Sequence, residues 1–285
     1  MSRIAYVNGQ YLPHAAAGVS IDDRALYFGD GVYEVCEVRD RRLIDEARHM
    51  ARLMRSLAAL RIAPPVTEGA LAKILREVVA RNRVRDGIVY LQISRGAAPR
   101  DHGFPAKPVR PSLTVTAKSL DTRRGEENAA RGVKVITLPE ERWAHPHIKT
   151  LQLLPNVLAK QAAREAGAYE AWFVDRDGFI TEGASTNAWI VTPAGVLVTR
   201  PTDEAILPGV TRLTLLDAAR GLGLEVEIRR FSRAEALGAR EAFFSSASTL
   251  AMPVVAIDSQ SIGNGEPGET TLALRRRFHA VAARS

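Results

Sequence analysis

Two ionisable side chains in the middle of the sequence stand in unusual surroundings. Lys149 precedes a leucine-rich run at residues 151–154, and apolar surroundings disfavour the charged form of an amine. A neutral amine can attack a carbonyl carbon and hold it as a Schiff base. Glu182 ends a predicted strand before a small-residue turn at 183–187; if buried, it needs a cationic partner, because an unpaired buried carboxylate is very costly. On these residues alone, a solvated lysine at the approach to a helix stays open as an alternative.

A protonated pyridine ring is one cation that such a glutamate could hold. A lysine together with a carboxylate is the combination that a pyridoxal phosphate (PLP) enzyme needs. The segment from Ile148 to Asn187, IKTLQLLPNVLAKQAAREAGAYEAWFVDRDGFITEGASTN, resembles the lysine-to-glutamate block of the fold-type IV PLP enzymes, aminotransferase class IV. Within that class it resembles the D-amino acid aminotransferases most closely. The resemblance extends from Val7 to the C-terminal helix.

The resemblance implies an α+β fold of two domains with PLP between them, assembled as a homodimer. It implies that Lys149 carries PLP and then moves a proton from the Cα of the substrate. Glu182 would keep the pyridine nitrogen protonated, so that the ring can take up the carbanion's electrons. The reaction would exchange an amino group between a D-amino acid and a 2-oxo acid such as pyruvate or 2-oxoglutarate.

A substrate-binding group is predicted in two places. Tyr33 lies in the motif FGDGVYEV at residues 28–35; on the residues alone it is a half-buried packing tyrosine, and by resemblance it faces the active site. Arg100 and His102 are two apart in an extended loop, so their side chains point the same way and could clamp a carboxylate. A basic surface loop is equally open. By resemblance the pair is the carboxylate trap of the D-amino acid aminotransferases, reaching from the partner subunit towards Tyr33.

Two motifs are candidates for binding the cofactor phosphate. Arg52 lies in the sequence HMARL at residues 49–53; alone it fits a solvated basic face, and by resemblance it binds the phosphate. Leu207, Val210 and Thr211 belong to LPGVTR at residues 207–212, which opens a predicted helix. Free backbone N–H groups at a helix start suit a phosphate, although a simple turn and N-cap is equally open. The resemblance implies that Val210 and Thr211 hold the phosphate and that Leu207 packs against the ring.

Small residues complete the predicted cofactor site. Ser185 lies in the turn after Glu182, and Ser246 and Ala247 end a predicted strand. Two positions depart from the family pattern: Ala247 stands where a threonine is common, and Ala184 replaces a hydroxyl residue. Backbone donors would have to act at those two places.

The elements that must position these residues follow from hydrophobic periodicity and turn signals. We expect a smaller N-terminal α+β domain at 1–118, a linker at 119–131 and a larger PLP-binding domain at 132–285. In the first domain we expect a hairpin at 4–12 around Asn8-Gly9, a strand to about residue 38, helices at 45–60 and 67–83, and strands at 88–94 and 111–117. In the second we expect strands at 133–138, 169–175, 179–182, 187–191, 196–199 and 252–257, a further strand ending near 249, and helices at 155–167, from about 210 to 220, and at 269–283.

Composition sets the remaining bounds. The chain has 285 residues, 46% hydrophobic and 25% charged, which fits two soluble globular domains. A net charge of +7 could indicate nucleic-acid binding, but the basic residues are scattered without a binding motif, and a mild bias towards anionic ligands is the simpler interpretation. Cys36 is the single cysteine, so no intrachain disulfide can form. The N-terminal residues lack the apolar core of a signal peptide, and we expect a cytoplasmic protein that binds no membrane.

Other functions are less well supported. His145 and His147 lack a nearby third ligand, so we expect no metal site. The sequence has no dinucleotide, phosphate-loop, zinc or nucleophile-elbow motif. A branched-chain or (R)-amine transaminase, or an aminodeoxychorismate-type lyase, would use the same cofactor machinery, and an inactive binding module on the same scaffold is an alternative of another class.

Overall fold

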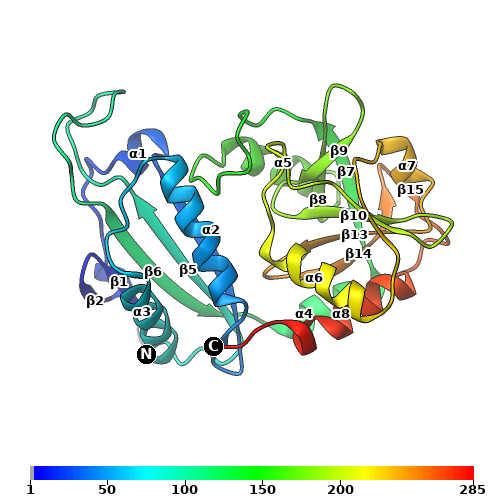
Figure 1. The fold of residues 1–285 in the computed structure, drawn as a ribbon, viewed down its shortest axis with the longest axis horizontal. Helices are drawn as coiled ribbons and strands as arrows, with labels where there is room; N and C mark the ends of the chain where they lie inside the picture. The colour runs from blue at the N-terminus through cyan, green and yellow to red at the C-terminus, as the bar shows by residue number, and fades with distance from the viewer. Residues whose placement is uncertain (1–2) are drawn as a thin grey trace. The chain divides into compact units, whose positions relative to one another are not determined.

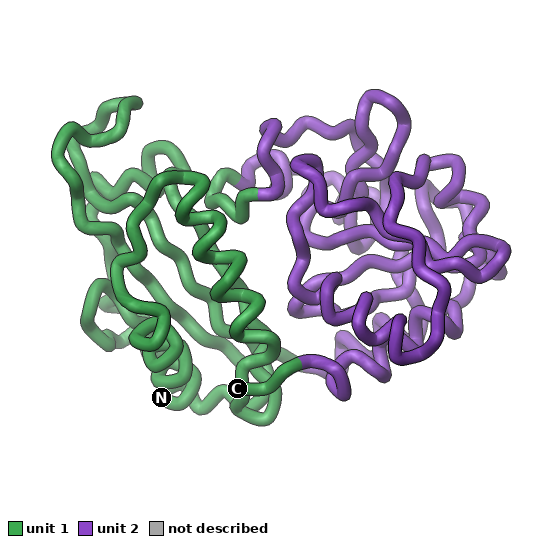
Figure 2. Tube along the Cα trace, viewed as in Figure 1, with its two compact units in different colours: residues 1–121, 148–152, 283–285 green, residues 122–147, 153–282 purple. Residues whose placement is uncertain are grey.

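The chain forms two compact units in the computed structural model, which describes residues 3–285 (Figure 2). Unit 1 comprises residues 1–121, 148–152 and 283–285, and unit 2 comprises residues 122–147 and 153–282. This division differs in detail from the predicted one. Residues 122–131, expected within a linker, form a helix of unit 2, because the polar segment has an amphipathic pattern that buries Ala129. Unit 1 also receives the short segment that carries Lys149.

Unit 1 is built on an antiparallel sheet. Its elements, in chain order, are β1 (Ile4–Val7), β2 (Gln10–Pro13), η1 (His14–Ala16), α1 (Arg24–Phe28), β3 (Gly31–Arg39), β4 (Arg42–Leu43), α2 (Glu46–Ala59), α3 (Glu68–Arg81), β5 (Gly87–Ser94) and β6 (Ser112–Ser119). Among the described residues, six strands pair in the order β2-β1-β6-β5-β3-β4. The predicted hairpin is confirmed: Asn8 and Gly9 have φ of 48° and 106°, the left-handed backbone that a two-residue hairpin turn requires.

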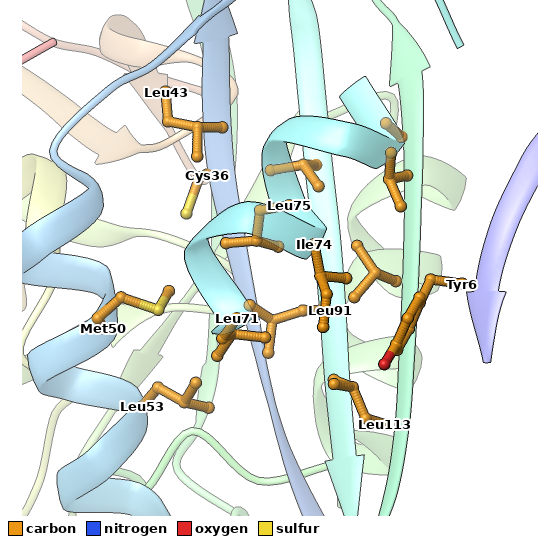
Figure 3. Packing of buried hydrophobic residues seen from close by; sticks show 14 of the residues in the cluster. Tyr6, Cys36, Leu43, Met50, Leu53, Leu71, Ile74, Leu75, Leu91 and Leu113 are labelled. Atoms are coloured by element: carbon orange, nitrogen blue, oxygen red, sulfur yellow. The ribbon is translucent and has the colours of Figure 1, made fainter. Parts of the chain in front are cut away.

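One face of this sheet is covered by α2 and α3 (Figure 1). The predicted alternation along β3 is confirmed, since Val32 and Cys36 are 0% exposed whereas Tyr33 on the other face is half-buried. Figure 3 shows Met50 and Leu53 of α2 packing into the same cluster as α3 and the strands. Fully burying an aliphatic side chain of this size contributes roughly 1.5–3 kcal/mol, so this layer holds β3 in place.

Unit 2 contains a mixed sheet flanked by helices. Its elements are α4 (Thr122–Arg131), β7 (Val133–Pro139), α5 (Leu154–Glu165), β8 (Glu170–Val174), β9 (Ile180–Gly183), β10 (Asn187–Val191), β11 (Leu197–Thr199), α6 (Val210–Gly221), β12 (Val226–Ile228), α7 (Arg233–Leu237), β13 (Glu241–Ser246), β14 (Leu250–Ile257), β15 (Gln260–Ser261) and α8 (Glu269–Val281). In the described part of the chain the strands pair in the order β12-β11-β10-β13-β14-β7-β8-β9, with β15 on β14.

The alternation along β8 shows how this sheet separates two clusters. Trp172 is 0% exposed and joins the cluster formed with β10, β13 and β14. Its neighbours Ala171 and Phe173 point the other way and pack with Ala159 and Ala163 of α5. The predicted α+β class is therefore observed in both units. Within residues 3–285, none of the helices is long and apolar enough to cross a membrane, and no group of three or more potential ligand side chains is arranged to hold a metal ion.

Candidate active site

Lys149 is held at the start of β3, although it follows β3 by more than a hundred residues in the chain. The backbone N–H of Tyr33 donates to the carbonyl of Lys149 at 3.0 Å, and that of Leu151 donates to the carbonyl of Gly31 at 3.0 Å. Val32 and Thr150 form the bridge between these bonds. The lysine segment thus pairs with β3 as a short additional strand, which fixes its backbone.

Two glycines of the FGDG motif make this pairing possible. A Cβ atom on Gly31 would lie 2.6 Å from the carbonyl oxygen of Ile93 and 2.7 Å from Cδ1 of Leu151. Gly29 has a φ of 64°, and a Cβ there would lie 2.8 Å from Cγ of Gln152. The sequence predicted a tight turn here; the structure adds that the missing side chains admit the lysine segment.

The amine of Lys149 lies on an aromatic surface. Its Nζ is 4.2 Å from the centroid of the Tyr33 ring, a distance at which a cation is attracted to the ring face. Tyr33 in turn stacks on Tyr90, with ring centroids 5.7 Å apart. Burial and the neighbouring Tyr33 raise the pKa of Tyr90 to about 12, so its hydroxyl stays neutral and donates to Gln92 at 2.9 Å. The predicted placement of Tyr33 beside the lysine is therefore what unit 1 contains.

Arg52 is buried in an ion pair rather than solvated. Its Nε and Nη2 donate to the two carboxylate oxygens of Glu34, each at 2.7 Å, and Nδ1 of His49 donates to the same carboxylate at 2.8 Å. Burial raises the pKa of Glu34, but the Arg52 guanidinium lowers it far more, to well below its usual range. Glu34 was not singled out from the sequence, because only the folded sheet brings β3 against α2. It fixes the orientation of the Arg52 guanidinium.

Arg100 and His102 are exposed and lie against one ring. The guanidinium carbon of Arg100 is 5.5 Å from the centroid of Phe28, and the His102 ring is 5.3 Å from the same centroid. The centroid of Tyr27 lies 6.0 Å from the Arg100 guanidinium carbon. The loop therefore presents both side chains on the same side, as the two-residue spacing predicted. Their aromatic partner is Phe28, whereas Tyr33 contacts Lys149 and Tyr90.

Glu182 is the centre of a buried hydrogen-bond network in unit 2. It is 4% exposed, and it accepts from Arg142 Nη1 at 2.5 Å, from Asn187 Nδ2 at 2.9 Å and from the backbone N–H of Leu207 at 3.1 Å. Burial raises the pKa of Glu182, and the guanidinium of Arg142 opposes that rise. The carboxylate is thus preorganised, with an arginine as one of its partners.

Arg142 is a residue of this site that sequence reasoning missed. Its Nε and Nη2 donate to Glu140 at 2.9 and 2.6 Å, and its guanidinium carbon lies 4.7 Å from the centroid of the Phe173 ring. The only signal in the sequence is a glutamate two residues before an arginine at the end of a strand, which is common on protein surfaces. Burial identifies the pair: the Arg142 side chain is 6% exposed.

The predicted phosphate-binding helix start is present at α6. Gly209 precedes the helix and supplies no side-chain cap, and Val210 and Thr211 form its buried first turn. The N–H groups of a first helical turn have no partner within the helix and suit an anion. Leu207 lies just before them and donates its backbone N–H to Glu182, so the motif links the carboxylate to the helix start.

The predicted hydroxyl residues occupy different surroundings. Ser246 ends β13, and its Oγ lies 2.8 Å from Oγ1 of Thr249, with Ala247 between them in a turn. Ser185 instead donates to the buried carboxylate of Glu170 at 2.8 Å. A role for Ser246 towards a phosphate fits a hydroxyl cluster, whereas Ser185 already has an internal partner.

The chemistry of these donors fits PLP. A lysine amine, a buried carboxylate, a buried arginine and an uncapped helix start are the groups that an aldehyde, a pyridine nitrogen and a phosphate require. Both units supply part of the set, Lys149 and Arg52 from unit 1 and Glu182 and α6 from unit 2.

Comparisons with known proteins agree with this chemistry. Residues 31–257 match the family described as Amino-transferase class IV. The chain is 40% identical over 266 residues to a D-alanine aminotransferase of Bacillus licheniformis, covering 93% of this chain and 92% of that protein. It is 35% identical over 273 residues to a D-alanine aminotransferase of Staphylococcus epidermidis, covering 96% and 95% of the two chains.

Solved structures share the fold. The branched-chain amino acid aminotransferase of Escherichia coli superposes with a TM-score of 0.91 at 25% identity, covering 99% of this chain and 95% of that one. A branched-chain amino acid aminotransferase of the organism abbreviated T.th., solved with pyridoxamine 5′-phosphate, gives a TM-score of 0.90 at 26% identity, covering 99% and 98%. On its own sequence motifs, its fold and these similarities, the chain belongs to the class IV aminotransferases, enzymes that use PLP.

Proposed function

We propose that this enzyme transfers the amino group between a D-amino acid and a 2-oxo acid such as pyruvate or 2-oxoglutarate. One observation carries the choice of substrate: the relatives that are 33–40% identical over nearly the whole chain are D-alanine aminotransferases. The branched-chain enzymes share the fold at 24–26% identity. The Arg100–His102 pair supports the same choice, because a guanidinium beside an imidazole suits a substrate carboxylate.

Lys149 is the proposed catalytic residue. Bound PLP supplies an electron-accepting ring that takes up the electron pair left when the Cα–H bond of the amino acid breaks. Lys149 attaches the cofactor and moves the proton from the Cα atom. Its backbone is fixed on β3 and its amine lies on Tyr33, so the proton acceptor has a defined starting position. Glu182 holds the pyridine nitrogen in its protonated form.

The remaining cofactor residues bind the phosphate in this proposal. Arg52 offers a guanidinium whose orientation is fixed by Glu34, and Val210 and Thr211 offer the first turn of α6. Ser246 adds a hydroxyl, and the backbone at Ala247 replaces the side chain that relatives carry there. Leu207 packs against the ring, and Ser185 is the weakest member of the set because Glu170 holds its hydroxyl.

We also propose a homodimer in which the Arg100–His102 loop completes the active site of the partner subunit. The contacts within one chain support this: Tyr33 contacts Lys149, whereas Arg100 and His102 contact Phe28. Exposed leucine and valine side chains on α5, Leu154, Val157 and Leu158, are 59–68% exposed and offer apolar surface for such an assembly. A cytoplasmic location belongs to the same proposal, since Cys36 is a buried thiol of the kind that a reducing compartment maintains.

A substrate panel tests the proposal. The purified holoenzyme is assayed with D- and L-alanine, L-leucine, an aryl (R)-amine and aminodeoxychorismate, with pyruvate or 2-oxoglutarate as acceptor for the amines. We expect turnover of D-alanine to exceed that of every other donor, and Lys149→Ala to abolish it. Faster turnover of L-leucine or of the aryl amine would replace the D-amino acid assignment by one of the alternatives. Pyruvate release from aminodeoxychorismate without an acceptor would indicate the lyase.

A further inference from the structure

The loop that carries Arg100 and His102 is fastened by a third arginine, Arg24, which the proposed function does not use. Arg24 is 3% exposed, although it lies in the short helix α1. Its Nη1 donates to the carbonyl of Asp101 at 2.7 Å and its Nη2 to the carbonyl of His102 at 3.4 Å. These two carbonyls belong to the residues that immediately follow Arg100.

Arg24 is itself fixed in orientation. Its Nε donates to Asp30 Oδ2 at 2.7 Å, and Asp30 also accepts from Arg95 Nε and Nη2 at 2.8 and 3.0 Å. Arg95 precedes the loop at the end of β5. One carboxylate therefore joins the arginine that grips the far part of the loop to the arginine at its base. Burying two guanidiniums is costly unless each is paired, so the arrangement is sensitive to loss of either partner.

Arg24 also reaches the side chain of His102 through Phe28. Its guanidinium carbon lies 4.7 Å from the centroid of the Phe28 ring, and that centroid lies 5.3 Å from the centroid of the His102 ring. The backbone of Arg24 donates to the carbonyl of Gly96 at 3.0 Å, and Asp23 bridges to Ala97. The base of the loop, its backbone beyond Arg100 and the His102 ring are thus all fixed by one residue and its neighbours.

We propose that Arg24 is the positioning residue of the substrate-binding loop, setting the geometry with which Arg100 and His102 receive the carboxylate of both substrates. The inference rests on the proposed role of that loop. Binding a carboxylate with a planar donor pair depends on direction, and a small displacement of the loop weakens it strongly. The Arg24 side chain binds Asp30 and the loop carbonyls, so its effect should fall on substrate binding rather than on the cofactor.

Arg24→Lys in the full-length holoenzyme is the primary test. A lysine keeps the positive charge beside Asp30, but one ammonium group cannot serve the carboxylate and both carbonyls in the geometry of a guanidinium. We expect KM for D-alanine and for pyruvate to rise by roughly 10-fold or more, with kcat reduced less than about 3-fold. The dissociation constant of PLP, followed by absorbance, and the melting temperature should stay close to wild type. Hydrogen exchange of the backbone between residues 99 and 104 should become faster.

Two further variants separate the outcomes. Arg81→Lys is the matched control, because Arg81 also pairs with one carboxylate, Glu77 at 2.7 Å, and covers one ring, Tyr11 at 4.3 Å, away from the loop; it should leave KM unchanged. Arg100→Ala tests the proposed function itself and should raise KM. If Arg100→Ala leaves KM unchanged, the proposed role of the loop fails. If Arg100→Ala raises KM but Arg24→Lys does not, or if Arg24→Lys lowers PLP affinity and melting temperature to the same degree, the positioning role of Arg24 is overturned.

Discussion

Tyr33 and Lys149 are joined twice: the Tyr33 N–H donates to the Lys149 carbonyl at 3.0 Å, and the Lys149 Nζ lies 4.2 Å from the centroid of the Tyr33 ring. A single residue of β3 therefore fixes both the backbone and the amine of the lysine. The buried face of β3 packs on α2, so the core of unit 1 sets the position of the proposed catalytic group.

Gly31→Ala tests this relationship through the backbone. The added Cβ would lie 2.6 Å from the Ile93 carbonyl and 2.7 Å from Leu151, so the lysine segment must move away from β3. Overpacking of this kind costs typically about 1–3 kcal/mol, and we expect at least about a 10-fold loss of kcat with it. Unfolding in urea and steady-state kinetics measure the two effects. Gly69→Ala is the control, since its Cβ would meet nothing within 4 Å on α3, and it should be neutral or stabilising. Wild-type kcat in Gly31→Ala would argue against the pairing.

Tyr33→Phe separates the ring from the hydroxyl. The variant keeps the surface beneath the lysine amine and the stacking on Tyr90, but it removes the group proposed to bind the substrate carboxylate. We expect KM for D-alanine to rise roughly 10-fold with little change in PLP affinity, as loss of one hydrogen bond to a charged group predicts. Tyr11→Phe, in the same unit and packed edge-on to Tyr6, should change neither. A fall in PLP affinity in place of the KM effect would assign Tyr33 to the cofactor.

Glu34→Gln should destabilise the protein and flatten its response to acid. The buried Arg52 guanidinium would lose its carboxylate, and breaking a buried pair costs about 3–5 kcal/mol. Because the pKa of Glu34 is lower in the folded protein than its ordinary value of 4.5, the wild type holds this stabilisation above about pH 4.5 and loses it as the pH falls towards the folded value. Urea unfolding between about pH 3 and pH 7 should show a steeper loss of stability in the wild type than in Glu34→Gln.

The exposed pair of Glu77 and Arg81 supplies the comparison for that experiment. Both side chains are about half exposed, 45% and 46%, so Glu77→Gln should cost no more than about 1 kcal/mol. Equal costs for the two substitutions would show that the Glu34 pair is not a special anchor. PLP affinity should fall only in Glu34→Gln, since only that variant releases Arg52.

Arg142→Gln tests the buried network around Glu182. The Arg142 guanidinium opposes the rise in the pKa of Glu182 that burial causes, so its removal should raise that pKa further. A carboxyl that is neutral over more of the pH range binds a protonated pyridine nitrogen less well. We expect kcat to fall at least about 10-fold and the acidic limb of its pH profile to move to higher pH. Arg220→Gln, whose Asp217 pair lies on the surface, should leave the profile unchanged, and an unmoved profile in Arg142→Gln would count against the coupling.

Local patterns predicted most of the elements and the motifs of the site. Asn8-Gly9 identified the first hairpin, and the alternation along β3 assigned Tyr33 and Glu34 to opposite faces. These features depend on residues close together in the sequence, where turn chemistry and periodicity act directly.

The partners of the site residues could not be predicted in the same way. Glu34 meets Arg52, Arg142 meets Glu182, and Arg24 meets the carbonyl of Asp101 only because the sheets bring distant segments together. Helix α4 was missed because a polar, charged segment with one buried alanine has little periodic signal, and its burial is decided by tertiary packing.

The lysine that PLP is attached to is the most direct test of the whole account. Treating the holoenzyme with sodium borohydride reduces an imine to a stable amine, and peptide mapping by mass spectrometry then locates the pyridoxyl group. The account predicts the label on Lys149. A label on Lys160 or on any other lysine of the chain, or no label on a protein that retains PLP, would contradict it.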